Sequence, residues 1–434
     1  MAREHFGTDG VRGVAGEKLT AELALGLGRA AAQETGVEHP RVLVIRDTRE
    51  SGEMLEAALA AGVTSAGGDV FLGGVLPTPA APLLLGQYGF DLAAVVSASH
   101  NPYADNGIKF FAADGFKLSD DHEDAIEERL RAPAVPCTSI GRVRALHGTQ
   151  EDYLRALEVR FKDLDLSGLD VLLDCAHGAT YKVAPEIFRR LGATVTTIGT
   201  EPDGRNINDG VGSTHVDALA AQVVSGGHAI GFAFDGDGDR LLAADRKGAV
   251  VDGDELIALA VLHLRAAGRL GGGVAVPVMT NYGFHSAMRA AGVEVATTAV
   301  GDRYVLECLR ERGWALGGEQ SGHIIDMGFV PSGDGIASAL LTLEALAGAD
   351  LADRHAMEKL PQKLVNCRVG DKTVAMAAVS DAAEAENGTL EGRGRVLVRA
   401  SGTEQLVRVM VEAPTAEECD AVCGRLVAVV ESAA

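Results

Sequence analysis

Long apolar runs are missing from this sequence. No uninterrupted apolar stretch reaches the roughly 18 residues that a membrane-spanning helix needs, and the stretch after Leu256 is broken by His263 and Arg265. The first six residues lack the apolar core of a signal peptide. We therefore expect a cytoplasmic protein that has no membrane partner.

Cysteines are also few and scattered. Six occur in 434 residues, at positions 137, 175, 308, 367, 419 and 423. Cys419 and Cys423 share one face of a predicted helix, but no second cysteine or histidine pair lies nearby in the sequence to complete a zinc site. The pattern predicts reduced, mostly buried thiols.

Basic residues are outnumbered by acidic ones. Lys and Arg total 39 against 61 Asp and Glu, which gives a formal net charge of −22. Such a chain repels nucleic acid and anionic membranes, so neither is expected as a partner. A small anionic substrate remains compatible, since it needs only a local cluster of Arg, Lys and backbone N–H groups.

Length and composition indicate a globular protein of several domains. A length of 434 residues corresponds to about three domains at roughly 150 residues each, with room for a small fourth. Apolar strand-like runs alternate with Ala/Leu-rich helical patterns; examples are residues 41–45, 93–96, 171–174 and 274–278. This alternation predicts βαβ units with mixed or parallel sheets.

Connections are predicted at residues 132–150, 246–254 and 361–372, where polar or turn-forming residues gather. They divide the chain into domain 1 (1–148), domain 2 (149–252), domain 3 (253–365) and a smaller domain 4 (366–434). In domain 4 we expect strands at 396–399 and 406–412. A helix over 415–431 follows, opened by the capping box of Thr415 and Glu418.

The sharpest local motif is acidic. Asp235, Asp237 and Asp239 alternate with glycines after the apolar run 230–234, and carboxylates at this spacing can point to one side of a loop. Oxygen ligands select Mg²⁺ or Ca²⁺. An EF-hand is excluded, because Arg240 and Arg246 stand where Gly and Glu are required. Repulsion among three carboxylates favours a metal site over an ordinary acidic turn.

A second motif, residues 97–102, follows the apolar run 93–96 and contains Ser99 and His100. It lies at a strand end, where α/β proteins usually build sites. Adjacent Ser and His residues rarely form a catalytic pair, and no G-x-S-x-G elbow is present. Taken alone, the motif is equally compatible with a polar turn and with a functional loop.

Two more loops have the composition of ligand sites. Residues 317–323 place donors and acceptors between glycines, which suits a hydroxyl-rich ligand, and residues 399–404 offer the parts of a phosphate cradle. A Gly26-x-Gly28-x-x-Ala31 match lies inside a helical pattern with no strand before it, so we reject it as a dinucleotide fingerprint.

In this order, these stretches resemble the α-D-phosphohexomutase superfamily. The segments 6–13, 206–215 and 300–305 point to its bacterial phosphoglucosamine mutase branch, and the resemblance spans essentially the whole chain. It implies three related α/β domains with mixed sheets and a smaller C-terminal α+β domain. They would form a heart-shaped molecule whose central cleft receives one loop from each domain.

The resemblance also implies roles for individual residues. It makes Ser99 the phosphoserine and, with the three aspartates, a ligand of one Mg²⁺ per chain. The reaction centre would be lined by Arg12, His100 and Lys109. Substrate contacts would come from Arg240, Glu319, Ser321, His323, Arg399, Ser401, Gly402, Thr403 and Arg408. Lys109 is the first choice for general acid/base, a role that requires cationic neighbours to lower its pKa.

The implied activity is interconversion of glucosamine 6-phosphate and glucosamine 1-phosphate, with glucosamine 1,6-bisphosphate as intermediate and activator. Two alternatives stay open. One is a phosphomannomutase/phosphoglucomutase with the same chemistry, and the other is a non-catalytic sugar-phosphate sensor. The sequence also leaves open whether the chain is a monomer or a homodimer.

Overall fold

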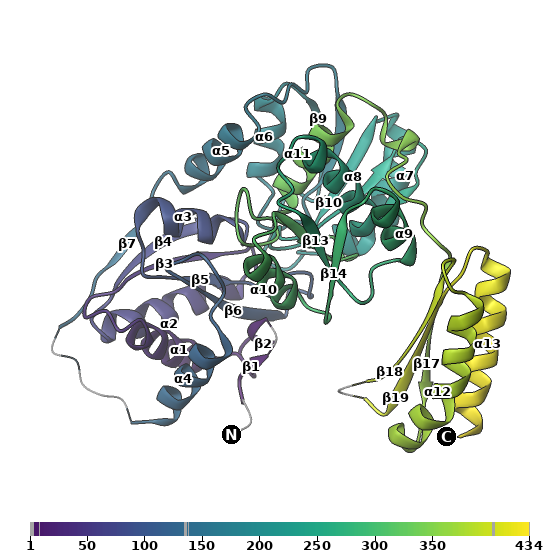
Figure 1. Cartoon of the computed structure of the whole chain (residues 1–434). Helices are drawn as coiled ribbons and strands as arrows, with labels where there is room; N and C mark the ends of the chain where they lie inside the picture. Colours follow the sequence, from purple (N-terminus) through teal and green to yellow (C-terminus); the bar gives the residue numbers. More distant parts are fainter. Residues whose placement is uncertain (1–3, 8, 134–136, 138, 402–403, 434) are drawn as a thin grey trace. The chain divides into compact units, whose positions relative to one another are not determined.

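The computed structural model describes residues 4–7, 9–133, 137, 139–401 and 404–433. The chain forms two compact units, Met1–Val278 with Ala296–Arg354, and Met279–Val295 with His355–Ala434. Four sheets follow one another along the sequence (Figure 1). Within the described ranges, no helix is both long and apolar enough to cross a membrane.

The first block contains a seven-stranded mixed sheet of order β1-β2-β6-β5-β3-β4-β7. Its strands are β1 (Phe6–Gly7), β2 (Gly10–Val14), β3 (Arg41–Arg46), β4 (Asp69–Val75), β5 (Leu92–Val96), β6 (Asp105–Ala112) and β7 (Val143–Ala145). Its helices are α1 (Ala21–Glu34), α2 (Ser51–Ser65), α3 (Ala80–Tyr88) and α4 (Asp120–Arg131). Strands β3, β4 and β5 run parallel, whereas β6 is antiparallel to β5 and β2. The predicted strands at 41–45 and 93–96 are β3 and β5; the expected connection at 132–150 contains β7, which pairs with β4.

Helices α1 and α2 approach closely through glycines. A Cβ atom at Gly28 would lie 2.3 Å from the carbonyl oxygen of Leu59, and one at Gly62 would lie 2.0 Å from that of Leu25. Gly28 was part of the rejected dinucleotide match. Its position inside α1, against the backbone of α2, confirms that rejection.

The next two blocks repeat the mixed α/β pattern. The second sheet has the order β12-β11-β10-β8-β9, with β8 (Asp170–Asp174), β9 (Thr194–Ile198), β10 (Ile230–Phe234), β11 (Leu241–Asp245) and β12 (Val250–Val251). Its helices are α5 (Thr149–Arg160), α6 (Val183–Arg190), η1 (Ser213–His215) and α7 (Val216–Gly226).

The third sheet has the order β14-β13-β15-β16, with β13 (Gly273–Pro277), β14 (Glu294–Thr298), β15 (Leu316–Gly318) and β16 (Ile324–Asp326). The helices along this stretch of the chain are α8 (Gly253–Ala266), α9 (Tyr282–Ala290), α10 (Asp302–Arg312), α11 (Gly335–Leu346) and η2 (Leu351–Asp353), of which α9 falls in the second compact unit. The predicted strands at 171–174 and 274–278 correspond to β8 and β13. The predicted architecture of three α/β blocks with mixed sheets is confirmed.

The C-terminal block is smaller and of the α+β class, as predicted. Its antiparallel sheet has the order β17-β19-β18, with β17 (Gln362–Arg368), β18 (Arg395–Ala400) and β19 (Leu406–Glu412), and it is accompanied by α12 (Lys372–Thr389) and α13 (Ala416–Ser432). The Thr415 hydroxyl accepts from the backbone N–H of Glu418 at the start of α13. Strand β17 occupies the expected connection at 361–372. It is a mostly exposed edge strand, so its sequence lacks a strong apolar pattern.

Helix α9 belongs to the same compact unit as the C-terminal sheet. The backbone N–H of Tyr282 donates to the carboxylate of Glu412 at 3.1 Å, and the Asn281 amide donates to the carbonyl of Leu360 at 3.0 Å. Arg395 completes this cluster, because it pairs with Glu412 at 2.6 Å and donates to the carbonyl of Thr280. Hydrogen bonds and one ion pair therefore connect the start of α9 to the C-terminal sheet within this unit.

The six cysteines are all free thiols, and four of them are buried. Cys137 is exposed and Cys308 is half-buried. This confirms the sequence prediction of reduced, mostly buried cysteines.

A buried hydrogen-bonded pair joins the second and third blocks. The Tyr153 hydroxyl of α5 donates to both carboxylate oxygens of Asp334, at 3.0 and 2.9 Å, and Asp334 also accepts from the backbone N–H of Ala337 at the start of α11. Burial raises the pKa of Asp334 to about 7.

This raised pKa predicts a pH-dependent stability. A carboxyl with a higher pKa in the folded state favours folding at low pH, and that contribution is lost as the pH rises toward 7. The substitution Asp334→Asn removes the titration. The free energy of unfolding of the variant, measured relative to wild type, should therefore rise by about 3 kcal/mol from pH 5 to pH 8. Urea denaturation at both pH values measures this, and a difference that stays constant with pH contradicts it.

Candidate active site

Ser99 lies in the loop that follows β5. Its backbone φ of 54° is left-handed, a conformation that costs a non-glycine residue about 1–3 kcal/mol and gathers at functional sites. The residue is 1% exposed. Its hydroxyl donates to Oδ2 of Asp235 at 2.5 Å and lies 3.4 Å from Nδ1 of His100. The structure thus places the predicted nucleophile against the first predicted metal ligand.

The acidic loop connects β10 to β11. Asp235, Asp237 and Asp239 are 0%, 1% and 4% exposed, and one oxygen from each lies within 4.8 Å of the others. Asp235 is oriented through its Oδ1, which accepts from the backbone N–H of Arg240 at 3.1 Å. The three predicted metal ligands therefore converge in the folded chain.

The unpaired oxygens of this loop fit a divalent cation. Oδ1 of Asp237 and Oδ1 of Asp239 are buried, and neither accepts a hydrogen bond from the described residues. Burial raises the pKa of Asp235, and repulsion from the other two carboxylates raises it further. Buried anionic oxygens without partners are costly, and hard cations such as Mg²⁺ prefer oxygen ligands. The residues present are therefore suited to Mg²⁺.

Lys109 lies among anions. Its Nζ is 2.9 Å from Oδ2 of Asp237, 3.1 Å from Oδ2 of Asp9 and 3.7 Å from Oδ2 of Asp239. Burial alone lowers the pKa of Lys109, but these carboxylates outweigh it and raise the pKa well above its ordinary value. The expectation that cationic neighbours lower this pKa is wrong, because Arg12 is the weaker influence. Lys109 is a charged donor here.

Backbone pairing joins the β15–β16 loop to the acidic loop. The N–H of Leu241 donates to the carbonyl of Gly322 at 3.0 Å, and His323 Nδ1 lies 3.6 Å from Oδ2 of Asp239. Burial lowers the pKa of His323, but the Asp239 carboxylate outweighs it and raises the pKa. In the same loop the Glu319 carboxylate accepts from the backbone N–H of Gly301 at 3.1 Å, and Ser321 is exposed.

Basic groups surround the centre. Arg12, on β2, pairs with Asp9, and Nε of Arg240 lies 3.8 Å from Oδ1 of Asp239. Burial, together with the charges of Arg240 and Arg12, lowers the pKa of His100. Three loops from three blocks thus bring the predicted reaction-centre residues together.

The fourth predicted loop lies in the C-terminal unit and connects β18 to β19. Arg399 and Arg408 stand directly opposite each other in the strand register, and like charges at such positions destabilise a sheet; the Glu404 carboxylate lies 3.9 Å from Nη2 of Arg408. Lys372 adds a third cation, since its Nζ donates to the carbonyl of Ser401 at 2.8 Å. The two remaining predicted contacts lie outside the described residues: Gly402 and Thr403.

Comparison with known families accounts for nearly the whole chain. Residues 3–134, 151–248 and 252–355 match the phosphoglucomutase/phosphomannomutase alpha/beta/alpha domains I, II and III, and residues 364–429 match the C-terminal domain. The chain belongs to the phosphoglucomutase/phosphomannomutase family. The superfamily assignment made from the sequence is confirmed.

Several members of the family are similar over their full length. A phosphoglucosamine mutase of Moorella thermoacetica is 50% identical over 428 residues, which cover 96% of each chain. One of Bacillus cereus is 45% identical over 99% of this chain and 98% of its own. Among solved structures, a Burkholderia thailandensis family protein has a TM-score of 0.82 at 26% identity and covers 98% of this chain and 96% of its own. An Aspergillus fumigatus N-acetylphosphoglucosamine mutase, solved with GlcNAc-6P and magnesium, has a TM-score of 0.71 at 17% identity and covers 99% and 96%.

The sequence analysis did not predict a chain of ion pairs that leads from Asp9 to His323 of the β15–β16 loop. Asp9 accepts from Lys117 at 2.6 Å, Lys117 contacts Asp302 at 2.5 Å, and Asp302 lies 3.7 Å from Nε2 of His323. Arg303 pairs with Glu123 at 3.0 Å. Asp302 and Arg303 therefore both form ion pairs with residues of the first block. Asp9 gave only a weak signal, as part of a glycine-rich opening segment.

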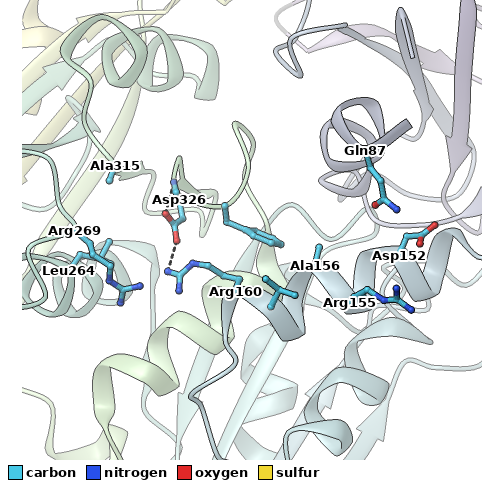
Figure 2. A pocket seen from close by; sticks show the side chains of 12 residues that line it. Gln87, Asp152, Arg155, Ala156, Arg160, Leu264, Arg269, Ala315 and Asp326 are labelled. Carbon is cyan, nitrogen blue, oxygen red and sulfur yellow. Dashed lines mark hydrogen bonds and ion pairs between the residues drawn. The ribbon is translucent and has the colours of Figure 1, made fainter. Parts of the chain in front are cut away.

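The described chain also contains a cavity of about 660 Å³ away from these loops (Figure 2). Arg155, Arg160 and Arg269 line it, but two of these arginines already form ion pairs with carboxylates. Arg160 contacts Asp326 at 2.8 Å, and Arg269 contacts Glu344 at 3.1 Å. Among the described residues, no predicted site residue lines this cavity.

Proposed function

We propose that this chain interconverts glucosamine 6-phosphate and glucosamine 1-phosphate by phosphoryl transfer to and from Ser99. The observation that carries the proposal is the hydroxyl of Ser99, held in a left-handed loop against the Asp235 carboxylate with Lys109 close by. The relatives named phosphoglucosamine mutase, at 45–50% identity over nearly the full length, support glucosamine as the sugar.

The reaction proceeds in two transfers. Phosphorylated Ser99 gives its phosphoryl group to the free hydroxyl of the sugar phosphate: the Oγ–P bond breaks, a sugar O–P bond forms, and the hydroxyl proton passes to the departing Oγ. The 1,6-bisphosphate then turns round and returns its other phosphoryl group to Ser99: that sugar O–P bond breaks, an Oγ–P bond forms, and the Oγ proton passes to the sugar oxygen. Lys109 and Arg12 offset the charge in transit, and His100, whose Nδ1 lies 3.4 Å from Oγ, relays the proton.

One Mg²⁺ per chain is proposed to bind Asp235, Asp237 and Asp239 together with phosphorylated Ser99. When bound, it neutralises charge on the transferring group. Support comes from the unpaired carboxylate oxygens and from the magnesium in the Aspergillus relative.

We also propose that the enzyme is cytoplasmic, because its cysteines are free thiols, as is usual in that compartment.

Sugar preference is tested by comparing kcat/KM for the phosphates of glucosamine, glucose and mannose, with Mg²⁺ and a bisphosphate primer present. We expect glucosamine to be preferred. A preference for either neutral sugar assigns the chain to phosphomannomutase/phosphoglucomutase activity instead. A protein that shows no turnover and never carries phosphate by intact-mass analysis is a sensor.

The Arg399/Arg408 pair predicts a phosphate-binding role for the C-terminal loop. Arg399→Ala should raise KM by roughly 10- to 100-fold, because a charge-assisted contact contributes about 1.5–3 kcal/mol. Steady-state kinetics measures the change. Arg393→Ala is the matched control, since that exposed arginine pairs with Glu418. An unchanged KM for Arg399→Ala rejects the assignment.

A further inference from the structure

We propose that Arg49 and Asn208 are positioning residues that hold the Ser99 loop in the conformation needed for phosphoryl transfer. This inference rests on the proposed role of Ser99 and adds a support that neither the sequence motifs nor the relatives' names assign. Their side chains hydrogen-bond to backbone carbonyls and to Asp47, not to Oγ of Ser99.

Arg49 hydrogen-bonds to the backbone of the Ser99 loop on the buried side of that loop. Its side chain is 0% exposed. Nη2 donates to the carbonyls of Ser99 and Asn101 at 2.9 and 2.8 Å, and Nη1 donates to those of Asp105, at 3.0 Å, and Pro102. One planar guanidinium therefore fixes four carbonyl groups spread over the whole turn, which a lysine ammonium cannot reproduce.

The partner of Arg49 fixes the other side of the nucleophile. Asp47 accepts from Nε of Arg49 at 2.8 Å and from the Ser97 hydroxyl at 2.6 Å. The same Ser97 oxygen accepts from the backbone N–H of Ser99 at 3.0 Å. The N–H and the carbonyl of Ser99 are thus both tied to one buried ion pair.

Asn208 reaches the same carbonyls from the second block. Its amide donates to Ser99 and Asn101 at 2.9 and 3.1 Å, while its own backbone N–H donates to the carbonyl of Ala176. The nucleophile loop of one block is therefore anchored on the block that carries the acidic loop. This contact sets the position of Oγ relative to Asp235.

These contacts offset the cost of the left-handed conformation at Ser99. If they are weakened, the loop can relax and Oγ moves away from the line of transfer. Misplacement of this kind lowers the rate of the chemical step, because small displacements of reacting groups cost large factors in rate. The three aspartates and the side chains predicted to contact the sugar remain in place.

The test compares Arg49→Lys and Asn208→Gly with wild type. Lysine keeps the charge opposite Asp47, and glycine tolerates the φ of 60° at position 208. We expect kcat to fall at least about 30-fold in Arg49→Lys and about 10-fold in Asn208→Gly. KM and the Mg²⁺ affinity measured by calorimetry should stay within about twofold, since neither residue is predicted to contact sugar or metal.

Arg41→Lys is the matched control, because Arg41 begins β3, the strand that precedes Arg49, and donates to the carbonyls of Tyr88 and Gly89, away from the loop. Its kcat should not change. A kcat within threefold of wild type in both variants overturns the proposal, and so does an equal loss in Arg41→Lys. If Arg49→Lys fails to fold by circular dichroism, Asn208→Gly decides alone.

Failure of the proposed function can be told apart from failure of this inference. The variants are assayed with whichever hexose phosphate the wild type converts best, so a wrong sugar assignment leaves the comparison intact. If wild type converts none, phosphorylation of Ser99 by glucose 1,6-bisphosphate is followed by intact mass. Slower labelling in both variants supports the positioning role; equal labelling, or none in wild type, overturns it.

Discussion

Replacing Ser99 by alanine should abolish mutase turnover, with kcat lowered by roughly four orders of magnitude or more. The reason is that its hydroxyl is the group placed at 2.5 Å from the Asp235 carboxylate and proposed to accept the phosphoryl group. A coupled assay for glucosamine 1-phosphate measures the loss. The fold should persist, because the loop is held through backbone atoms that alanine retains.

The control for this variant is Ser65→Ala, which removes a hydroxyl on α2 that donates only locally, to the carbonyl of Gly62. It should retain full activity. Intact-mass analysis should find phosphate on wild type and on the control but not on Ser99→Ala. Turnover by Ser99→Ala above about a tenth of the wild-type rate refutes the phosphoserine role.

Removal of the divalent cation should have an effect of similar size. Chelation should lower turnover by about 1000-fold, restored by added Mg²⁺. Asp237→Asn should weaken Mg²⁺ binding and lower kcat by roughly 100-fold or more. Its Oδ1 is one of the buried oxygens without a hydrogen-bond partner among the described residues, and an amide cannot replace its charge.

Calorimetry with Mg²⁺ alone separates loss of the metal from loss of chemistry in this variant. Asp209→Asn is the matched control, since it removes an exposed carboxylate at a distance in sequence from the acidic loop. Its Mg²⁺ affinity should match wild type. Full activity in the presence of chelator, or unchanged Mg²⁺ binding by Asp237→Asn, contradicts a metal site at the three aspartates.

The fold could be predicted where local patterns carry the information. Apolar runs of four to six residues mark buried strands such as β3, β5 and β10, and the capping residue Thr415 marks the start of α13. Strands β7 and β17 could not be predicted in this way. Both are edge strands with few buried side chains, and they form because a neighbouring strand supplies hydrogen bonds.

The site could be predicted where a motif places its own residues together, as in the alternating aspartates. Contacts between distant segments could not. Arg49 reaches a loop about 50 residues further along the chain, and Lys117 reaches Asp302 across 185 residues. The ionisation of Lys109 is also a property of the assembled site. It depends on Asp9 and Asp237, which lie on different loops.

The contacts of helix α9 determine which segments must be exchanged together in a chimera between two relatives. It falls inside the segment that matches family domain III, yet its first residues bind the buried carboxylate of Glu412 and the chain at Leu360. A chimera joined near residue 364 would separate Glu412 from the backbone N–H of Tyr282 that it accepts from. The segment to exchange is therefore discontinuous in sequence. Residues 279–295 must be transferred together with residues 355–434, so that the Glu412 carboxylate keeps its hydrogen-bond donor in the chimera.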